Sequence, residues 1–230
     1  MFQPTKKQTL SGIAYFLVFH MILLPPIVFQ LLRIFFSGNR IMPIFQFALI
    51  LITTCFYLFL FRQPLKQGLR KLGKLVPSLL WRVPVGYIVV LVLRAVIMVV
   101  IVHYYGEPNL GLNQDAVENI AMQAPLLIAF LAIVLAPLWE ELLFTGLIFG
   151  SLQRRSRLIA YVVASLGFGL LHTWPMFIGG FSTLSILITL IYVPSALVSC
   201  RLYEKTDNLW SPIIFHSFSN AVAFLTMAMV

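Results

Sequence analysis

The chain is short of charged residues and of cysteine. Lys, Arg, Asp and Glu make up 10% of its 230 residues, whereas a soluble domain has about 25%. The two cysteines, Cys55 and Cys200, support neither a disulfide framework nor a cysteine-rich metal site. There is also no P-loop, no Rossmann glycine fingerprint, no internal repeat and no low-complexity segment. These absences exclude a disulfide scaffold and the standard nucleotide-binding motifs.

Apolar residues are abundant instead. They make up 60% of the chain, and the mean hydropathy is +0.97. Several apolar stretches exceed the roughly 18 residues that indicate a membrane-spanning helix. A helix satisfies its backbone polar groups internally, as a bilayer requires. The sequence therefore predicts an all-α polytopic integral membrane helical bundle, with a single transmembrane domain over residues 1–230.

We expect about seven membrane-spanning helices. The first is preceded by Lys6 and Lys7, but it is too long for a signal peptide and has no small-residue cleavage site, so we expect it to be retained. Residues 63–82 place leucines among basic residues, which indicates an amphipathic helix on the cytoplasmic surface or an ordinary basic loop. The spans are expected at about 10–36, 41–61, 83–105, 119–152, 158–174, 177–200 and 209–229.

The net charge of +9 follows the positive-inside pattern. Most basic residues fall before the first span or in the loops after the second, fourth and sixth, whereas the loop near 106–118 is acidic. We therefore expect no nucleic-acid partner, a cytoplasmic N-terminus, an outside C-terminus and basic loops facing anionic lipid headgroups. The basic residues concerned are Lys6, Lys7, Arg62, Lys66, Arg70, Lys71, Lys74, Arg82, Arg154, Arg155, Arg157, Arg201 and Lys205.

Few charged or strongly polar side chains lie inside the spans. A charge at mid-bilayer costs a few kcal/mol or more, so each is a candidate functional group. By helical rise, the glutamates, the last two histidines and the asparagine can share one layer within the membrane. A lone buried histidine is more often structural, and we interpret the first two histidines in that way. The candidates are Arg33, Arg94, Glu140, Glu141, Asn220, His20, His103, His172 and His216.

Spacing assigns these side chains to helix faces. His216 and Asn220 are four residues apart and share a face, as do Phe168 and His172. The adjacent glutamates at 140 and 141 point about 100° apart, so they cannot aim at one point. We therefore expect the two carboxylates to have separate roles.

Pro137 lies one turn before this pair of glutamates. It lacks a backbone N–H, so we expect it to free the carbonyl of Ile133 and to kink the span close to the site.

Three segments, "EELLFTG", "FGLLH" and "HSFSN", resemble the signature of the CAAX-protease and bacteriocin-processing family of intramembrane proteases, also called the Abi family. Its motifs are Glu-Glu-x-x-x-Arg, Phe-x-x-x-His and His-x-x-x-Asn/Asp, on separate helices in that order. Here they fall within about residues 120–225. The resemblance implies an endopeptidase that cleaves a membrane-associated peptide or protein, and it favours a bacterial plasma membrane.

The resemblance also implies residue roles. Glu140 would act as general base on the attacking water, and His172 would help to hold that water. His216 and Asn220 would stabilise the oxyanion, with Phe168 in support. Preorganised donors in a dry cavity suit this chemistry. We expect no cofactor; the alternative is zinc bound by the first glutamate and the two histidines, although no His-Glu-x-x-His motif is present.

One position departs from the motif. The family's arginine falls at position 145, which is Thr145 here, so Glu141 lacks the cation expected four residues after it. Either this carboxyl is protonated or another cation reaches it. Arg94 lies about 18 Å into its span from Arg82, at a similar depth. We expect Arg94 to stand in for the missing arginine.

Two other functions are compatible with these residues. A non-catalytic relative would act by binding, in bacteriocin immunity or sensor regulation. A transporter could use the two glutamates as a proton relay or cation site, but no inverted repeat is present and acidic residues lie in one span only. Neither the substrate nor the oligomeric state follows from the sequence.

Overall fold

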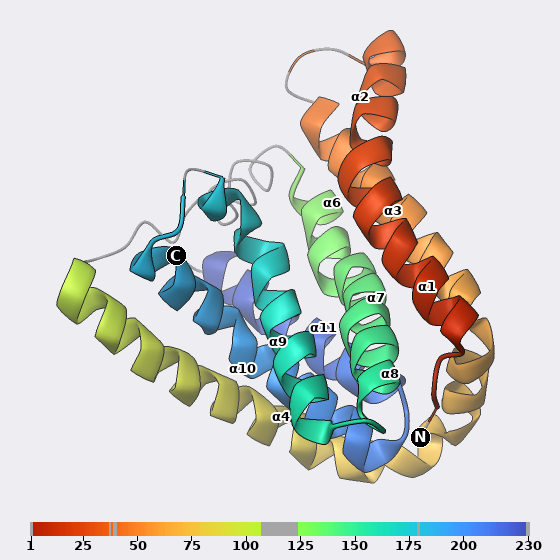
Figure 1. The fold of residues 1–230 in the computed structure, drawn as a ribbon, viewed down its shortest axis with the longest axis vertical. Coiled ribbons are helices and arrows are strands. Elements are labelled where there is room, and N and C mark those ends of the chain that lie inside the picture. Colours follow the sequence, from red (N-terminus) through yellow and green to blue (C-terminus); the bar gives the residue numbers. More distant parts are fainter. Residues whose placement is uncertain (1, 37, 39–40, 107–123, 179, 229–230) are drawn as a thin grey trace.

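A computed structural model describes residues 2–36, 38, 41–106, 124–178 and 180–228, and every regular element in these ranges is a helix (Figure 1). In the described ranges six helices are long and apolar enough to cross a membrane, against about seven predicted spans. The helix at the seventh predicted position, α11, is not among these six. The helical membrane bundle is therefore confirmed. The elements are α1 (Lys6–Ala14), η1 (Tyr15–Leu23), α2 (Leu24–Phe35), α3 (Ile41–Leu60), α4 (Arg62–Tyr105), α6 (Pro125–Phe130), η3 (Leu131–Leu135), α7 (Ala136–Glu141), η4 (Leu142–Phe149), α8 (Gly150–Leu152), α9 (Arg157–Thr173), η5 (Trp174–Phe177), α10 (Thr183–Thr206) and α11 (Trp210–Ala228).

The segment 63–82 is not a loop. It forms one continuous helix, α4, with the third predicted span, and Pro77 and Pro84 lie inside it. Its 44 residues make it about 66 Å long, roughly twice the hydrocarbon thickness of a bilayer. One half of α4 must therefore lie outside the hydrocarbon. In its N-terminal part Leu65 and Leu79 are buried whereas Lys66 is exposed. The segment is therefore helical, and the alternative of a basic loop was wrong. Its place on the cytoplasmic surface stays a prediction.

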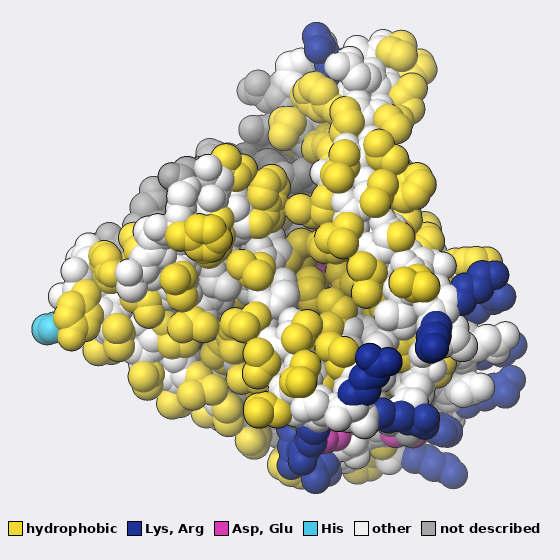
Figure 2. Space-filling model, in the orientation of Figure 1, with side chains coloured by type: hydrophobic (Ala, Val, Ile, Leu, Met, Phe, Trp, Pro, Cys, Tyr) yellow, Lys and Arg dark blue, Asp and Glu magenta, His cyan; other side chains and the backbone are white. Residues whose placement is uncertain are grey.

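Charge is concentrated at one end of the molecule. Figure 2 shows the dark blue Lys and Arg side chains gathered around the end where Figure 1 places the N-terminus, while apolar side chains cover most of the remaining surface on this face. This distribution fits a membrane protein whose basic end meets the headgroups. The cytoplasmic orientation of that end stays a prediction.

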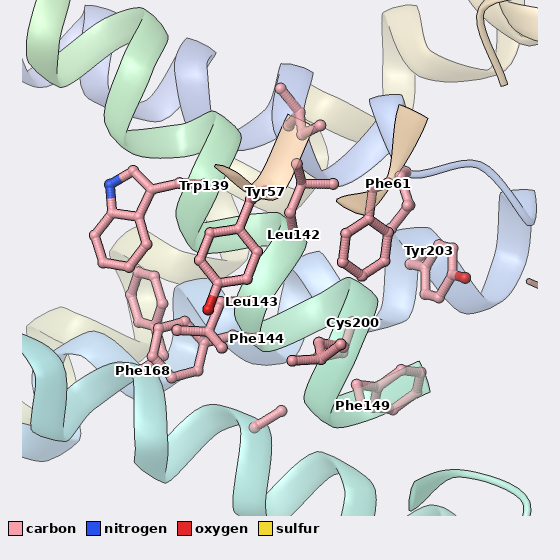
Figure 3. Packing of buried hydrophobic residues seen from close by; sticks show 14 of the residues in the cluster. Tyr57, Phe61, Trp139, Leu142, Leu143, Phe144, Phe149, Phe168, Cys200 and Tyr203 are labelled. Atoms are coloured by element: carbon pink, nitrogen blue, oxygen red, sulfur yellow. The ribbon is translucent and has the colours of Figure 1, made fainter. Parts of the chain in front are cut away.

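The fourth span, from Pro125 to Leu152, lies at the centre of the bundle. Half of its most apolar 18-residue window is buried, against 11–39% for the other five candidate spans. Tyr57 of α3, Phe61 between α3 and α4, Phe168 of α9 and Tyr203 of α10 pack around it (Figure 3). The glutamate pair is thus carried by the helix that is best shielded from lipid.

Candidate functional site

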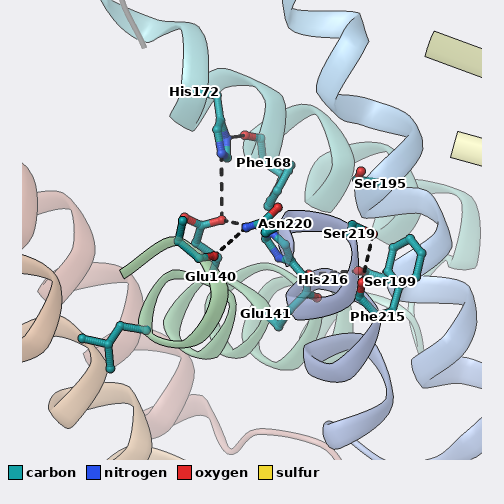
Figure 4. A network of polar contacts seen from close by, with 12 residues as sticks. Glu140, Glu141, Phe168, His172, Ser195, Ser199, Phe215, His216, Ser219 and Asn220 are labelled. Carbon is teal, nitrogen blue, oxygen red and sulfur yellow. Dashed lines mark hydrogen bonds and ion pairs between the residues drawn. The ribbon is translucent and has the colours of Figure 1, made fainter. Parts of the chain in front are cut away.

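Glu140 faces two histidines from two other helices. Its Oε2 lies 3.9 Å from Nε2 of His172, at the end of α9, and 3.9 Å from Nε2 of His216, on α11 (Figure 4). The same oxygen is buried and has no hydrogen-bond partner among the described residues. Three side chains separated by up to 76 positions in the sequence therefore converge on one point.

A backbone hydrogen bond orients His172. Its Nδ1 lies 2.9 Å from the carbonyl oxygen of Phe168, and because a carbonyl only accepts, Nδ1 carries the proton. The ring stacks on Tyr192 with centroids 4.5 Å apart. These contacts direct Nε2 towards Glu140.

His216 lies between the two glutamates. Its Nδ1 is 2.9 Å from Oε1 of Glu141, whereas its Nε2 faces Glu140. Phe168 packs edge-on against the ring, with centroids 5.6 Å apart. The adjacent carboxylates thus meet opposite nitrogens of one imidazole, as their different helix faces predicted.

Hydroxyl groups complete the surroundings of Glu141. Thr145 donates to its Oε2 at 2.7 Å, and Ser199 on α10 donates to its Oε1 at 2.9 Å. With His216, the carboxylate has three hydrogen bonds in a buried position. The sequence analysis missed Ser199; a signal was available, since Ser195 and Ser199 form a polar stripe four residues apart in an apolar span.

Asn220 tethers α11 to the distorted helix that carries the glutamates. Its Nδ2 donates to the carbonyl of Ala132 at 2.7 Å. The Leu131–Leu135 stretch is π-helical, and the N–H of Ala136 donates to Leu131, five residues back. In that register the next donor would be Pro137, which has no N–H. The freed carbonyl is therefore that of Ala132, not the expected Ile133, and Asn220 satisfies it.

Comparisons with known proteins match the part of the chain that holds this site. Residues 122–222 match the family described as type II CAAX prenyl endopeptidase Rce1-like. The family resemblance is confirmed. The membrane-embedded CAAX protease MroQ of Staphylococcus aureus (strain USA300) is 30% identical over 142 residues, which cover 59% of this chain and 53% of MroQ. YdiL of Bacillus subtilis (strain 168), named as a candidate membrane peptidase, is 25% identical over 144 residues, 62% of this chain and 54% of YdiL.

The chain spans about half the length of the curated relatives it matches. No solved structure matches it. The Rce1-like segment includes the glutamates, both site histidines and Asn220, but it excludes α1 to α4.

Arg94 makes its hydrogen bonds to α10 and not to the glutamates. Its guanidinium donates to the carbonyl of Ile191 at 3.1 Å and to Ser195 Oγ at 3.0 Å, both on α10. Among the described side chains it forms no ion pair with Glu140 or Glu141. Hydroxyl donors and an imidazole occupy both oxygens of Glu141, and acceptors on α10 hold the guanidinium. That Arg94 stands in for the motif arginine without direct contact stays a prediction.

No group of three His, Cys, Asp or Glu side chains in the described part of the chain is arranged to hold a metal ion. The donor types at the centre would nevertheless suit zinc, because the Nδ1 hydrogen bonds of His172 and His216 leave both Nε2 atoms free to act as ligands when the rings are neutral.

An apolar cavity adjoins the site. It has a volume of about 430 Å³ and lies between the first helix (α1 and η1), η4 and α9. Ile13 and Phe16 line one side, Gly167 and Leu170 the other, and Phe144, one turn after Glu140, also borders it. Figure 2 shows this side of the molecule hollowed between the first helix and α9, with an acidic side chain visible inside. The hollow thus lies beside the helix that carries the glutamates.

Proposed function

We propose that the protein is an intramembrane endopeptidase of the CAAX-protease type that hydrolyses a peptide bond with water activated by Glu140. The observation that carries the proposal is the 3.9 Å spacing between Oε2 of Glu140 and the Nε2 atoms of His172 and His216. This spacing is too long for a direct hydrogen bond and suits one bridging water.

In the proposed reaction Glu140 takes a proton from that water, and the water oxygen attacks the peptide carbonyl carbon. Glu140 then passes the proton to the leaving nitrogen as the carbon–nitrogen bond breaks. Glu141 orients His216 and stabilises positive charge on its ring, so that Nε2–H can donate to the oxyanion. Asn220 has a second amide N–H besides the one donated to Ala132, and we assign this second donor to the oxyanion as well.

We propose that the substrate is a peptide or protein held at the membrane. The cavity beside Phe144 is apolar and faces the lipid side of the helices, so it suits a hydrophobic segment or attached hydrocarbon chain. The printed names of the Rce1-like family and of MroQ support a CAAX-type activity. They do not identify the peptide.

The test compares wild type with E140Q, H172A and H216A. Membrane peptides from producing cells are compared by mass spectrometry, and a peptide cleaved only by the wild type is then assayed with purified protein in nanodiscs. We expect each variant to lose at least about 100-fold in kcat. E204Q, which changes a carboxylate at the far end of α10, is the matched control and should stay active.

Survival of peptide cleavage in all three variants, at normal protein levels, would contradict the roles proposed for these residues. Survival of a bacteriocin-immunity or sensor-regulation function in cells that make any of the three variants would favour a non-catalytic relative that acts by binding. The metal-free mechanism has a separate test. Stoichiometric zinc in the purified protein, lost with activity on chelation and restored by added zinc, would favour the zinc alternative held by Glu140, His172 and His216.

A further inference from the structure

Arg94 is a charged residue in an apolar span that the site chemistry leaves unexplained. It is half-buried, lies on α4 and falls outside the Rce1-like segment. Both hydrogen bonds of its guanidinium go to neutral acceptors, the Ile191 carbonyl and Ser195 Oγ. A charge kept at membrane depth without a carboxylate partner is costly, and such residues commonly serve a functional site.

The contacts of α10 relate this cation to the site. Ser195 accepts a hydrogen bond from Arg94, and Ser199, one turn further along the same face, donates to Glu141 (Figure 4). The contacts that Arg94 and Glu141 make with α10 are therefore one helical turn apart.

The site holds more groups that are negative, or become negative, than fixed positive charges. Glu140 and Glu141 are both buried, and an attacking water would add a developing oxyanion. No other Lys or Arg among the described residues hydrogen-bonds to a residue of this group. In a low-dielectric interior a fixed charge acts across several ångströms without contact.

We propose that Arg94 is a positioning residue that acts through its charge: held at a distance by Ser195 and Ile191, the guanidinium stabilises negative charge at Glu140, Glu141 and the oxyanion. Because the guanidinium does not contact Glu141, the oxygens of Glu141 stay hydrogen-bonded to Thr145, Ser199 and His216. This inference rests on the proposed peptidase function. It gives α4, which the family match does not cover, a part in the chemistry.

A purely mechanical role is the competing explanation. The same two hydrogen bonds could simply brace α4 against α10. Gln at this position keeps an amide donor and removes the charge, whereas Lys keeps the charge and loses the planar fork. If the charge of Arg94 matters, R94K should be more active than R94Q. If only its hydrogen bonds matter, R94Q should be more active than R94K.

The experiment measures kcat, KM and the thermal unfolding midpoint of R94Q and R94K in nanodiscs, with the cleaved peptide identified above as the probe. We expect R94Q to lose about 10- to 100-fold in kcat, with KM within about twofold of the wild type and an unchanged midpoint. R94K should retain at least about a third of kcat. R33Q is the control, because Arg33 is an exposed arginine near the far end of α2.

Normal kcat in R94Q overturns the proposal. So does equal loss in R94Q and R94K, or an R94Q protein that does not fold, since each makes Arg94 a brace. The proposed function is judged separately: if E140Q is inactive while R94Q keeps normal kcat, only the role of Arg94 fails. If E140Q is active, the peptidase proposal itself fails.

Discussion

At the scale of single residues, the two adjacent glutamates differ in what surrounds them. Glu140 has a buried oxygen without a hydrogen-bond partner among the described residues, 3.9 Å from each of two imidazoles. Glu141 accepts from Thr145, Ser199 and His216. An open carboxylate suits proton transfer, and a fully hydrogen-bonded one suits orientation of a neighbour. These surroundings fit the proposed roles, with Glu140 as the reactive group and Glu141 as the supporting one.

The hydrogen bonds to Glu141 yield a stability prediction. T145V keeps the side-chain shape but leaves one buried carboxylate oxygen without its donor, so the free energy of unfolding should fall by about 1–3 kcal/mol. T226V removes an exposed helical hydroxyl and is the matched control. Thermal unfolding in mild detergent measures both. If T145V were as stable as T226V, the Thr145 hydroxyl would not be what replaces the motif arginine.

Part of this residue-level arrangement was predictable. The spacing of Glu140, Glu141, His172 and His216 placed two carboxylates on different faces and the histidines at a shared depth, because helical rise and periodicity are local properties. The partner of Arg94 was not predictable. Depth alone cannot tell which neighbouring helix a long side chain meets first.

At the scale of elements, close packing of α9 on α10 positions His172. A Cβ at Gly169 would lie 2.8 Å from the carbonyl oxygen of Thr189 and 2.9 Å from its Cγ2. The hydroxyls of Thr173 and Thr189 meet at 2.7 Å just beyond. The glycine therefore permits the approach that brings the α9 histidine to the site.

The variant G169A tests this approach. The added methyl should force α9 and α10 apart, lower the free energy of unfolding by about 1–3 kcal/mol and reduce kcat, because His172 is three residues further on. G73A is the control: nothing lies within 4 Å of its added carbon, so it should be neutral or slightly stabilising. Equal free energies of unfolding and equal kcat values for G169A and G73A would show that the helices tolerate a wider separation.

The sequence predicted some features of the helices and missed others. The apolar stretches predicted the membrane-spanning helices but not the continuity of α4, because the basic residues of 63–82 set that segment apart from the third predicted span. The π-helical register at Leu131–Leu135 was also missed. It moves the freed carbonyl from Ile133 to Ala132, and only the position of Asn220 on α11 accounts for its satisfaction.

At the scale of the whole molecule, the reactive carboxylate lies in the most buried span, and the apolar cavity opens beside it. A substrate in the membrane would reach the site sideways, between the first helix and α9. The basic end of the bundle is separate from this opening on the face shown in Figure 2. On the proposed function, substrate access and contact with lipid headgroups would use different parts of the surface.

Narrowing the cavity should weaken substrate binding more than chemistry. Ile13→Trp places a large ring in the cavity wall, so KM for the membrane peptide should rise about tenfold, equivalent to about 1.4 kcal/mol, with kcat little changed. Ile34→Trp, at an exposed apolar position on α2, is the control. Steady-state cleavage in nanodiscs gives both constants. An unchanged KM would argue against lateral entry through this cavity.

By itself the sequence determined that the protein is a helical membrane bundle, which residues share helix faces, and that one motif position lacks its arginine. These properties depend on composition and on the geometry of a single helix. Only the tertiary structure decided that Thr145, Ser199 and His216 hold Glu141, that Arg94 is held by Ser195, and that Asn220 satisfies Ala132. The physical reason is that these contacts depend on how helices rotate and pack against one another.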